Sequence, residues 1–467
     1  MLIEFKVKNF KCFREQAVLD LRPAKQDKEL LGNIWEGNKG DAVKSAAIFG
    51  PNASGKTSML EALQVLRRFV AISVTSMNAG DPIPGIKPYL LSKTTSESPT
   101  EFYVEVELEG VGYIYELVVS QKAVFREILK YRGAKGSAKW IKLIDRDLAN
   151  GTAKLHEKLI GSKPRRDQLV ADTRDNALFL SRAAERNVGV VKPLFLWFRN
   201  GITHVDASEG LEFSNYELTK VAKAAREDPS LLTKLTELVR DADTGIARIR
   251  TETVDPATRW GMPGAKSEQK EAEGRLTEAL KQMINALEDV HPGALDDALG
   301  TSFYTEHVSQ LGELLRFDLM QESSGTKQYL WLSGMLIMAR KRPTLFLVDE
   351  LHTSLHPMLS TRLVQMVNSP ELGNGGTQFI FTTHDVTLLN PSLLRRDQIY
   401  LTQKNSKGSA EIYSLWDFED MPRNNAAWGR NYLAGRFGGI PVFGPSLADI
   451  PQADAPTRVH SETVGAK

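Results

Sequence analysis

The segment from Gly50 to Thr57 constrains the fold of this chain more than any other part of the sequence. It matches the pattern G-x-x-x-x-G-K-[ST]. An apolar run precedes it and apolar residues at helical spacing follow it, which predicts a buried strand over Ser45–Phe49 and a helix over Lys56–Val70. A glycine-bearing turn between the two can point backbone N–H groups inward, and the helix adds the positive end of its dipole. The pattern therefore predicts a loop that holds phosphate groups.

Each residue of this loop has an expected contact with a bound nucleotide. Lys56 should reach the β- and γ-phosphates, which makes it a candidate catalytic residue, and the Thr57 hydroxyl should coordinate Mg²⁺. We therefore expect ATP and Mg²⁺ as cofactors. An ordinary strand–turn–helix is the alternative for the loop taken alone. The expected nucleotide contacts are Gly50, Pro51, Asn52, Ala53, Ser54, Gly55, Lys56, Thr57 and Ser58.

Two later apolar strands end in side chains suited to hydrolysis. Leu345–Val348 is followed by Asp349, placed to hold Mg²⁺ through water, and by Glu350, placed to orient or activate a water molecule. Phe379–Thr382 is followed by His384, which is placed to sense the γ-phosphate. Taken alone, an Asp-Glu pair after an apolar strand is equally well explained as acidic residues at a helix N-terminus. A single histidine in such a position is more often a packing residue. Both interpretations depend on the presence of the loop.

A polar turn at Glu322–Thr326 precedes a further apolar helix. Its hydroxyl residues and glycine suit a phosphate contact at the helix N-terminus, through Ser323 and Gly325. A simple capping turn explains the same residues, and would be preferred without the other motifs.

The order of these motifs resembles that of ABC-type ATPase heads of the SMC, RecF and OLD kind. The chain is most similar to stand-alone prokaryotic AAA family ATPases of the abortive-infection or phage-defence type, which lack a Toprim domain. The segments that carry the resemblance are Phe5–Phe13, Gly50–Thr57, Ser323–Thr326, Asp349–Glu350, Ser354–Pro357, Thr383–Asp385, Leu394–Ile399 and Tyr432–Pro441.

The resemblance implies a nucleotide sandwiched between two protomers, so we expect a homodimer. The loop of one protomer would face Ser323 and Gly325 of the other. Ser354–Pro357 would lie where the D-loop crosses the dimer. Lys11 would contact the nucleotide, and His384 would be the switch histidine. The signature reads S-S-G-T instead of L-S-G-G-Q, and no Q-loop glutamine is assigned.

The resemblance and the alternation of strands and helices predict an α/β fold, a P-loop NTPase with an ABC-ATPase-like head, a mixed β-sheet and a helical insertion. We expect an N-terminal ATPase lobe with a β-subdomain over 1–200 and a helical insertion or lid over 201–310. A C-terminal ATPase lobe should follow over 311–442, and a disordered tail over 443–467. Strands are predicted over 2–8, 17–21, 45–49, 102–108, 113–119, 123–131, 314–319, 344–348, 378–382, 398–402 and 411–414, and helices over 56–70, 176–185, 193–198, 230–239, 267–290, 326–340 and 357–367.

Charge and cysteine content bear on the possible partners and on the cellular compartment. The chain has 59 Lys and Arg against 58 Asp and Glu, a formal net charge of +1, which neither demands nor excludes a nucleic-acid partner. Basic clusters at 163–166 and 340–342 could meet nucleic acid, although solvated surface charge is the more ordinary explanation. One cysteine, Cys12, cannot form an internal disulfide and favours a reducing compartment.

No stretch approaches the roughly 20 apolar residues that span a bilayer, so we expect a cytoplasmic protein without a membrane partner.

The leading hypothesis is an ATP-hydrolysing dimerisation switch. Head closure would control a partner effector encoded nearby, in nucleic-acid surveillance or antiviral defence. An ATP-dependent nuclease acting on DNA or RNA is the first alternative, although we expect no room for a Toprim domain after the sheet. A transporter ATPase subunit is the second, disfavoured by the altered signature. A small-molecule kinase would share the loop but has no need of His384 or Ser323.

Overall fold

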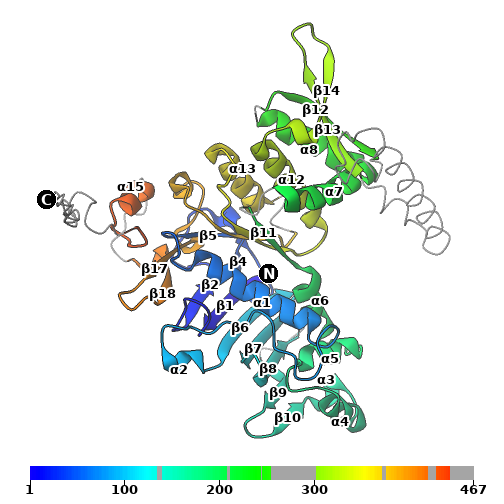
Figure 1. The fold of residues 1–467 in the computed structure, drawn as a ribbon, viewed down its shortest axis with the longest axis vertical. Coiled ribbons are helices and arrows are strands. Elements are labelled where there is room, and N and C mark those ends of the chain that lie inside the picture. The colour runs from blue at the N-terminus through cyan, green and yellow to red at the C-terminus, as the bar shows by residue number, and fades with distance from the viewer. Residues whose placement is uncertain are drawn as a thin grey trace, which may run out of the picture.

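The computed structural model describes residues 1–133, 139–207, 211–242, 244–253, 301–370, 375–418 and 427–441. Within these residues, two large β-sheets lie on either side of helix α1 (Lys56–Ile72), and a smaller lobe stands on the far side of one sheet (Figure 1). The predicted α/β character of the chain is confirmed.

The phosphate-binding loop lies at the end of a strand in a six-stranded sheet of order β11-β15-β16-β5-β17-β18. The first five strands in this order are parallel to one another, and β18 is antiparallel to β17. Parallel strands bring their carboxyl ends to one edge of a sheet, so the ends of β5, β16 and β15 lie side by side there. The bounds are β5 (Ser45–Phe49), β11 (Ile202–Asp206), β15 (Leu345–Asp349), β16 (Gln378–Thr382), β17 (Ile399–Lys404) and β18 (Ala410–Ser414).

The second sheet is antiparallel, with seven strands in the order β10-β9-β8-β7-β6-β1-β2. The predicted hairpin between β6 and β7 is confirmed, and positive φ angles of 53° at Glu109 and 77° at Gly110 form its tight turn. The bounds are β1 (Leu2–Lys8), β2 (Ala17–Asp20), β6 (Thr100–Leu108), β7 (Val111–Val119), β8 (Val124–Arg132), β9 (Ile141–Asp147) and β10 (Thr152–Leu155).

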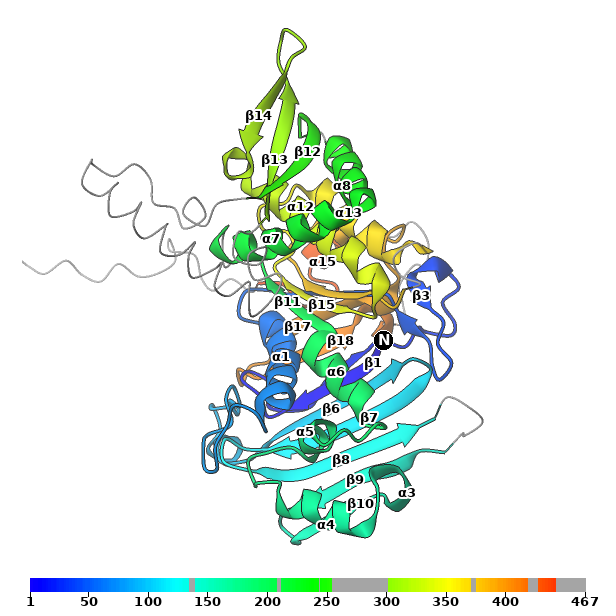
Figure 2. The ribbon, with the colours of Figure 1, turned by 90° about the vertical axis from the view of Figure 1, so that its right-hand side faces the viewer.

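Helix α1 fills the space between the two sheets, as Figure 2 shows. The predicted apolar stripe of α1 is its buried face, made of Met59, Leu60, Leu63, Leu66 and Phe69. The other described helices on this side are α2 (Lys93–Ser96), α3 (Glu157–Ile160), α4 (Lys163–Ala171), α5 (Phe179–Glu185) and α6 (Lys192–Asn200), and a short hairpin joins β3 (Ile34–Trp35) to β4 (Ala42–Val43).

The six-stranded sheet separates two hydrophobic cores. Along β5, Ala46 and Ile48 belong to the core that contains α1, whereas Ala47 and Phe49 belong to the core on the other face. Helices α12 (Ser324–Met338) and α13 (Pro357–Asn368) cover that second face. Because both faces are covered, β5, β15 and β16 are buried along their whole length, which explains their continuous apolar character.

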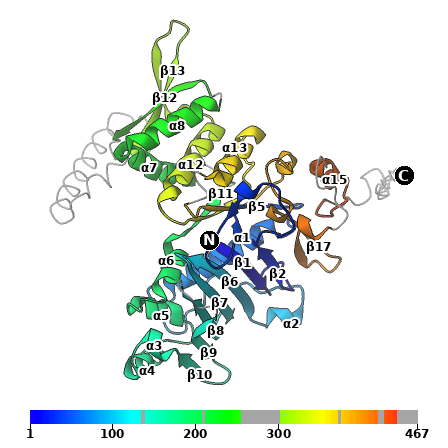
Figure 3. The same cartoon turned by 180° about the vertical axis from the view of Figure 1, so that it is seen from behind.

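A lobe packs on α12 and extends away from both sheets (Figures 1 and 3). It comprises helices α7 (Leu211–Glu227) and α8 (Pro229–Asp241) and a three-stranded antiparallel sheet, β12 (Ile246–Thr253), β13 (Thr301–Val308) and β14 (Leu314–Asp318). Gly334 makes the contact between α12 and α7 close, because any Cβ there would overlap Val221.

Among its described residues, the block 201–310, for which a helical insertion was predicted, contains strands as well as helices. Strand β11 belongs to the central sheet, and β12 and β13 form a sheet with β14, which was expected in the C-terminal lobe. The buried Ile246 and Ile249 are three residues apart, a spacing that also suits a helix; a bulge between Ile246 and Arg248 puts both on one face of the strand. The helix predicted over 267–290 and the tail over 443–467 lie outside the described residues.

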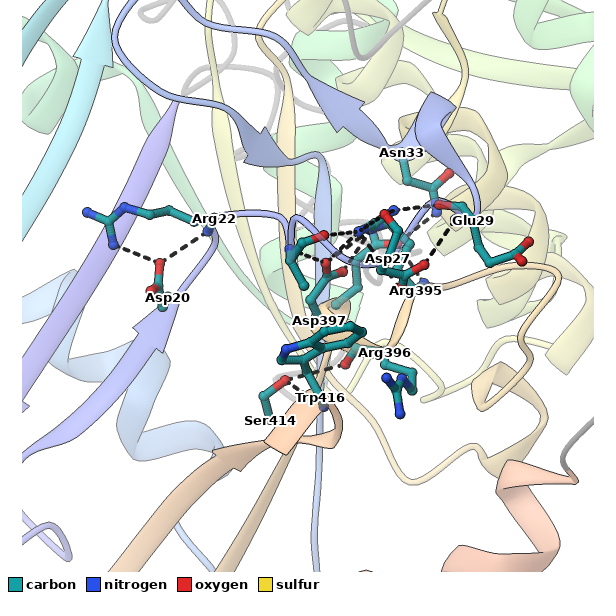
Figure 4. A network of polar contacts seen from close by, with 12 residues as sticks. Asp20, Arg22, Asp27, Glu29, Asn33, Arg395, Arg396, Asp397, Ser414 and Trp416 are labelled. Atoms are coloured by element: carbon teal, nitrogen blue, oxygen red, sulfur yellow. Dashed lines mark hydrogen bonds and ion pairs between the residues drawn. The ribbon is translucent and has the colours of Figure 1, made fainter. Parts of the chain in front are cut away.

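The segment Leu394–Ile399, at the amino end of β17, contains a buried network of polar contacts around Arg395 and Asp397, called the clasp below (Figure 4). The fully buried Arg395 donates from Nε to Asp397 Oδ1 at 2.9 Å and from Nη2 to Asp397 Oδ2 at 2.7 Å. Arg395 also donates to the backbone carbonyl of Glu29, and Ala24 N donates to Asp397 at 2.7 Å. The clasp therefore fastens the loop after β2 to the end of the sheet opposite the phosphate-binding loop.

The segment Tyr432–Pro441 packs beside the other end of β5. It begins in helix α15 (Trp428–Leu433), and the Tyr432 ring meets the Phe49 ring edge to face, with centroids 6.1 Å apart. Tyr432 Oη donates to the carbonyl of Gly439 at 2.7 Å. This turn therefore supports the strand residue that directly precedes the phosphate-binding loop.

Candidate functional site

The loop Gly50–Thr57 forms a cradle whose shape requires glycine at two positions, Gly50 and Gly55. At Gly50 a Cβ would overlap Thr402, and at Gly55, where φ is +115°, a Cβ would lie 3.1 Å from Cys12 Sγ. Within the described residues no side chain caps α1, so the N–H groups of its first turn are left for a ligand. The predicted placement between β5 and α1 is confirmed, and the cradle fits a chain of phosphate groups.

Thr402, on the neighbouring strand β17, shapes this loop and was missed by the sequence reasoning. Its hydroxyl lies 2.5 Å from Ser54 Oγ and donates to the carbonyl of Phe49 at 3.2 Å. Thr402 belongs to no motif in the sequence. The register that places Leu401 opposite Phe49 brings Thr402 to the loop, and it joins residues far apart in the chain.

Lys56 is buried and its ammonium group is held at the mouth of the loop. Its Nζ donates to the carbonyls of Gly50 and Pro51, at 2.9 and 3.1 Å, and lies 3.0 Å from His384 Nε2. Burial lowers the pKa of Lys56, and the charges of Asp349 and other nearby carboxylates act in the opposite direction. Because an ammonium group can only donate, His384 Nε2 is the acceptor in this contact.

Asp349 and Glu350 lie at the end of β15, as predicted, and Thr382 of β16 binds both residues. The Thr382 hydroxyl donates to Asp349, which is 4% exposed, and accepts from the backbone N–H of Glu350 at 2.8 Å. Glu350 has a φ of +54°. Its carboxylate accepts from the Thr353 hydroxyl at 3.3 Å. A side chain on the neighbouring strand thus fixes the relative position of the two acids.

His384 follows β16, which lies between β15 and β5 in the sheet. This order brings the histidine to Lys56 on one side and to the acids on the other. Burial lowers the pKa of His384, and Lys56 and the neighbouring His352 lower it further, whereas the carboxylates of Glu350 and Asp349 act to raise it. A neutral imidazole that accepts from Lys56 is therefore the form that the site favours.

The oxygen atoms at this edge suit magnesium bound together with a nucleotide. Asp349 offers a carboxylate, and Thr57 is exposed in the first turn of α1. Mg²⁺ takes few protein ligands and completes its shell with water and phosphate oxygens, so a carboxylate and a hydroxyl fit that requirement. In the described part of the chain, no three His, Cys, Asp or Glu side chains gather as a stand-alone metal site.

Ser323 and Gly325 lie at the start of α12, which packs in the core on the face of the six-stranded sheet opposite α1. Ser323 caps α12 and accepts from the backbone N–H of Thr326 at 3.1 Å, so the capping role considered for it is present. A Cβ at Gly325 would overlap the carbonyl oxygen of Ser354, in the segment after Glu350, where Ser354 has a φ of +61°. The predicted signature therefore contacts the segment expected to cross the dimer.

Glu322, directly before this signature, is bound by the lobe. Its carboxylate lies 2.8 Å from His307 Nε2 and accepts from the Thr305 hydroxyl, both on β13. The position of Ser323 is thereby linked to the position of the lobe.

Lys11 and Ser58 have partners within the chain. Lys11 Nζ forms an ion pair with Glu61 of α1, and its backbone N–H donates to Lys87 O at 2.7 Å. Burial raises the pKa of the Cys12 thiol, and a hydrogen bond with Ser58 lowers it. Ser58 is in the first turn of α1, and Lys11 contacts this helix through Glu61, so a nucleotide contact by Lys11 would compete with Glu61.

A cavity of about 610 Å³ lies at the opposite end of the strands, and no candidate site residue lines it. Its walls come from α6, the end of α12 and the start of β15, and include Leu196, Trp197, Met335, Met338 and Thr344. Lys56, Asp349 and His384 lie at the other edge of the sheet, so this cavity is not the candidate site.

Among the helices that the structure describes, none has both the length and the apolar character needed to cross a bilayer.

No curated protein matches the chain. A solved structure of the recombination mediator protein RecF-ATP in the RecFOR pathway is 15% identical, with a TM-score of 0.29, and the match covers 88% of this chain and 97% of that one. The sequence model of one family, described as "AAA domain, putative AbiEii toxin, Type IV TA system", matches residues 45–390, well over half of the chain. The chain therefore belongs to this family of AAA domains, and its fold is that of a P-loop ATPase.

Proposed function

We propose that this chain binds ATP with Mg²⁺ in the loop Gly50–Thr57 and hydrolyses it. The observation that carries the proposal is the convergence of Lys56, Asp349, Glu350 and His384 at one edge of the sheet, from three neighbouring strand ends. Phosphate transfer to water needs little covalent chemistry from the protein, and positioned charges supply most of the catalysis.

The residues divide the work as follows. Lys56 neutralises charge on the β- and γ-phosphates. Asp349 and Thr57 would hold Mg²⁺, which would supply further positive charge to the nucleotide. Glu350, oriented by Thr353, accepts a hydrogen bond or a proton from the attacking water. His384 contacts the γ-phosphate in place of its present contact with Lys56.

We further propose that Ser323 and Gly325 complete the site of a second copy of the chain. Support comes from the surface around them, because Ser323 is exposed and large apolar side chains are exposed on both sides of the contact between Gly325 and Ser354. Met320 is 56% exposed and Met358 is 74% exposed. Exposed apolar side chains beside a polar motif are typical of an interface.

The biological role that we propose is a cytoplasmic switch, in which ATP-dependent closure of two heads acts on an effector encoded nearby. The family description, which names a putative toxin of a type IV TA system, supports a role in defence. Nucleic acid remains a candidate partner of the closed dimer.

The first experiment tests the dimer. Glu350→Gln removes the carboxylate while keeping its size, so ATP should bind and persist. Size-exclusion chromatography with light scattering should show a Glu350→Gln dimer with ATP and Mg²⁺, and a monomer without nucleotide. The matched control is the double variant Lys56→Ala/Glu350→Gln, which should stay monomeric with ATP. A Glu350→Gln monomer at saturating ATP would refute the shared site.

The second experiment tests which chain supplies each half of the site. Lys56→Ala and Ser323→Arg should each be inactive alone. An equal mixture forms heterodimers with one intact composite site, so about a quarter of the wild-type ATPase rate should return. No recovery in the mixture would show that each chain uses only its own residues.

A further inference from the structure

His352 lies two residues after Glu350, in the segment between β15 and α13, and none of the roles above uses it. Its Nδ1 accepts a hydrogen bond from the backbone N–H of His384 at 3.4 Å. The two imidazole rings also meet edge to face, with centroids 5.4 Å apart and an interplanar angle of 81°. His352 is half-buried, so the contact lies inside the site and is not a surface pairing.

His384 needs such a partner because it lies just beyond the end of β16. The last backbone bond from this strand to β5 runs from Thr383 N to Ile48 O at 3.1 Å. Beyond that point the sheet no longer fixes the chain, and His352 is the acceptor recorded for the N–H of His384 in the described structure. Lys56 contacts the imidazole from the other side, at Nε2.

The surroundings of His352 keep its Nδ1 able to accept. Burial lowers its pKa, Glu350, Asp385 and Asp349 act to raise it, and Lys56 acts to lower it. A neutral ring carries its proton on Nε2 when Nδ1 accepts, and this tautomer matches the bond to His384.

We propose that His352 is a positioning residue for ATP hydrolysis. Its Nδ1 fixes the backbone that carries His384 and thereby aims the His384 imidazole at the terminal phosphate. This inference rests on the proposed function. His352 itself touches no phosphate, so its loss should affect turnover more than nucleotide affinity. The reason is geometric, because displacing a catalytic group by about 1 Å can lower a rate by about 100-fold.

The test compares substitutions that keep or remove the acceptor in the full chain. His352→Asn places an amide oxygen near the position of Nδ1, whereas His352→Leu has no acceptor and His352→Phe keeps only the ring contact. We expect His352→Leu and His352→Phe to lower kcat for ATP about tenfold with KM changed less than about twofold. His352→Asn should stay within about threefold of the wild-type kcat.

His156→Leu is the matched control, because His156 is also half-buried but directly follows β10, the edge strand of the antiparallel sheet. Its kcat should equal that of the wild type. The Phe and Asn variants keep the comparison intact if the Leu variant does not fold, which circular dichroism will show.

A double substitution tests whether His352 acts through His384. Under single-turnover conditions, adding His352→Leu to His384→Ala should cause no further loss of rate. A further tenfold loss in that background, or equal kcat losses in the Asn and Leu variants, would refute the inference. So would wild-type kcat in both acceptor-free variants. A wild-type chain that hydrolyses no ATP would instead refute the proposed function, and this inference with it.

Discussion

Gly325 and Ser354 touch through their backbones: a Cβ placed on Gly325 would overlap the carbonyl oxygen of Ser354. Ser354 reaches this position with a φ of +61°, four residues after Glu350. The start of α12 and the segment after the acidic pair therefore cannot move independently. In a shared site, contact of Ser323 with the partner's nucleotide would be felt at the chain's own Glu350.

Gly325→Ala should disturb that contact, because the new methyl group meets backbone and not a flexible side chain. We expect an unfolding free energy about 1–3 kcal/mol lower and a reduced ATPase rate. Urea denaturation and a phosphate-release assay measure the two effects. Gly189→Ala is the control, since a Cβ there meets nothing within 4 Å. Equal behaviour of the two variants would contradict the proposed coupling.

Thr402→Val should weaken nucleotide binding without removing a predicted ligand. The substitution nearly preserves shape but leaves Ser54 Oγ and the carbonyl of Phe49 without their shared partner. Leaving a buried polar group unpaired costs about 1–3 kcal/mol. Isothermal titration with a non-hydrolysable ATP analogue should therefore show lower affinity. The control Thr236→Val, whose hydroxyl donates to the carbonyl of Leu232 within α8 at 2.9 Å, should bind normally. Unchanged affinity in Thr402→Val would mean that the loop holds its shape alone.

Acidification should destabilise the fold through the two histidines of the site. Burial lowers the pKa of both His384 and His352, so the folded chain binds fewer protons than the unfolded chain below about pH 6.5. The stability that this provides is present above that pH and is lost as the pH falls. Urea denaturation at about pH 7.5 and pH 5.5 should show a smaller acid-induced loss for His384→Asn than for the wild type. His156→Asn should behave as the wild type, and identical losses in all three proteins would exclude this origin.

Arg395→Met should destabilise the chain by about 3–5 kcal/mol, because Asp397 would remain as a buried charge without its partner. The additional change Asp397→Leu removes that charge and should recover part of the loss. Chemical denaturation of the single and double variants measures the difference. The ATPase rate of folded Arg395→Met should stay near wild type, since the clasp is at the far end of the sheet. A variant that is stable but inactive would contradict this structural role.

The sequence predicts the parts of the site that depend on neighbouring residues in the chain. A buried strand, a glycine turn and a helix with an apolar stripe specify the loop locally, and apolar strands ending in Asp349 and His384 are recognisable for the same reason. Thr382 and Thr402 could not be found in this way. Their roles depend on which strand lies beside which, and the pairs β15–β16 and β5–β17 join distant segments.

Strand β11 shows a second limit of sequence reasoning. It has only five residues, and polar Thr203 and His204 interrupt its apolar pattern. Its place in the sheet comes from parallel pairing with β15. The Leu394–Ile399 segment was noticed as a motif, but its clasp depends on a loop more than 360 residues earlier in the chain.

The attachment points of the lobe have a consequence for how the chain can change. The lobe begins just after Asp206, which pairs in register with Asp349, and it returns through Glu322 directly into Ser323. The first junction lies beside Asp349 and the second leads into Ser323, while the body of the lobe packs on α12 and supplies none of the four convergent residues. A lobe of different structure could therefore be inserted between these junctions without replacing any of the four convergent residues.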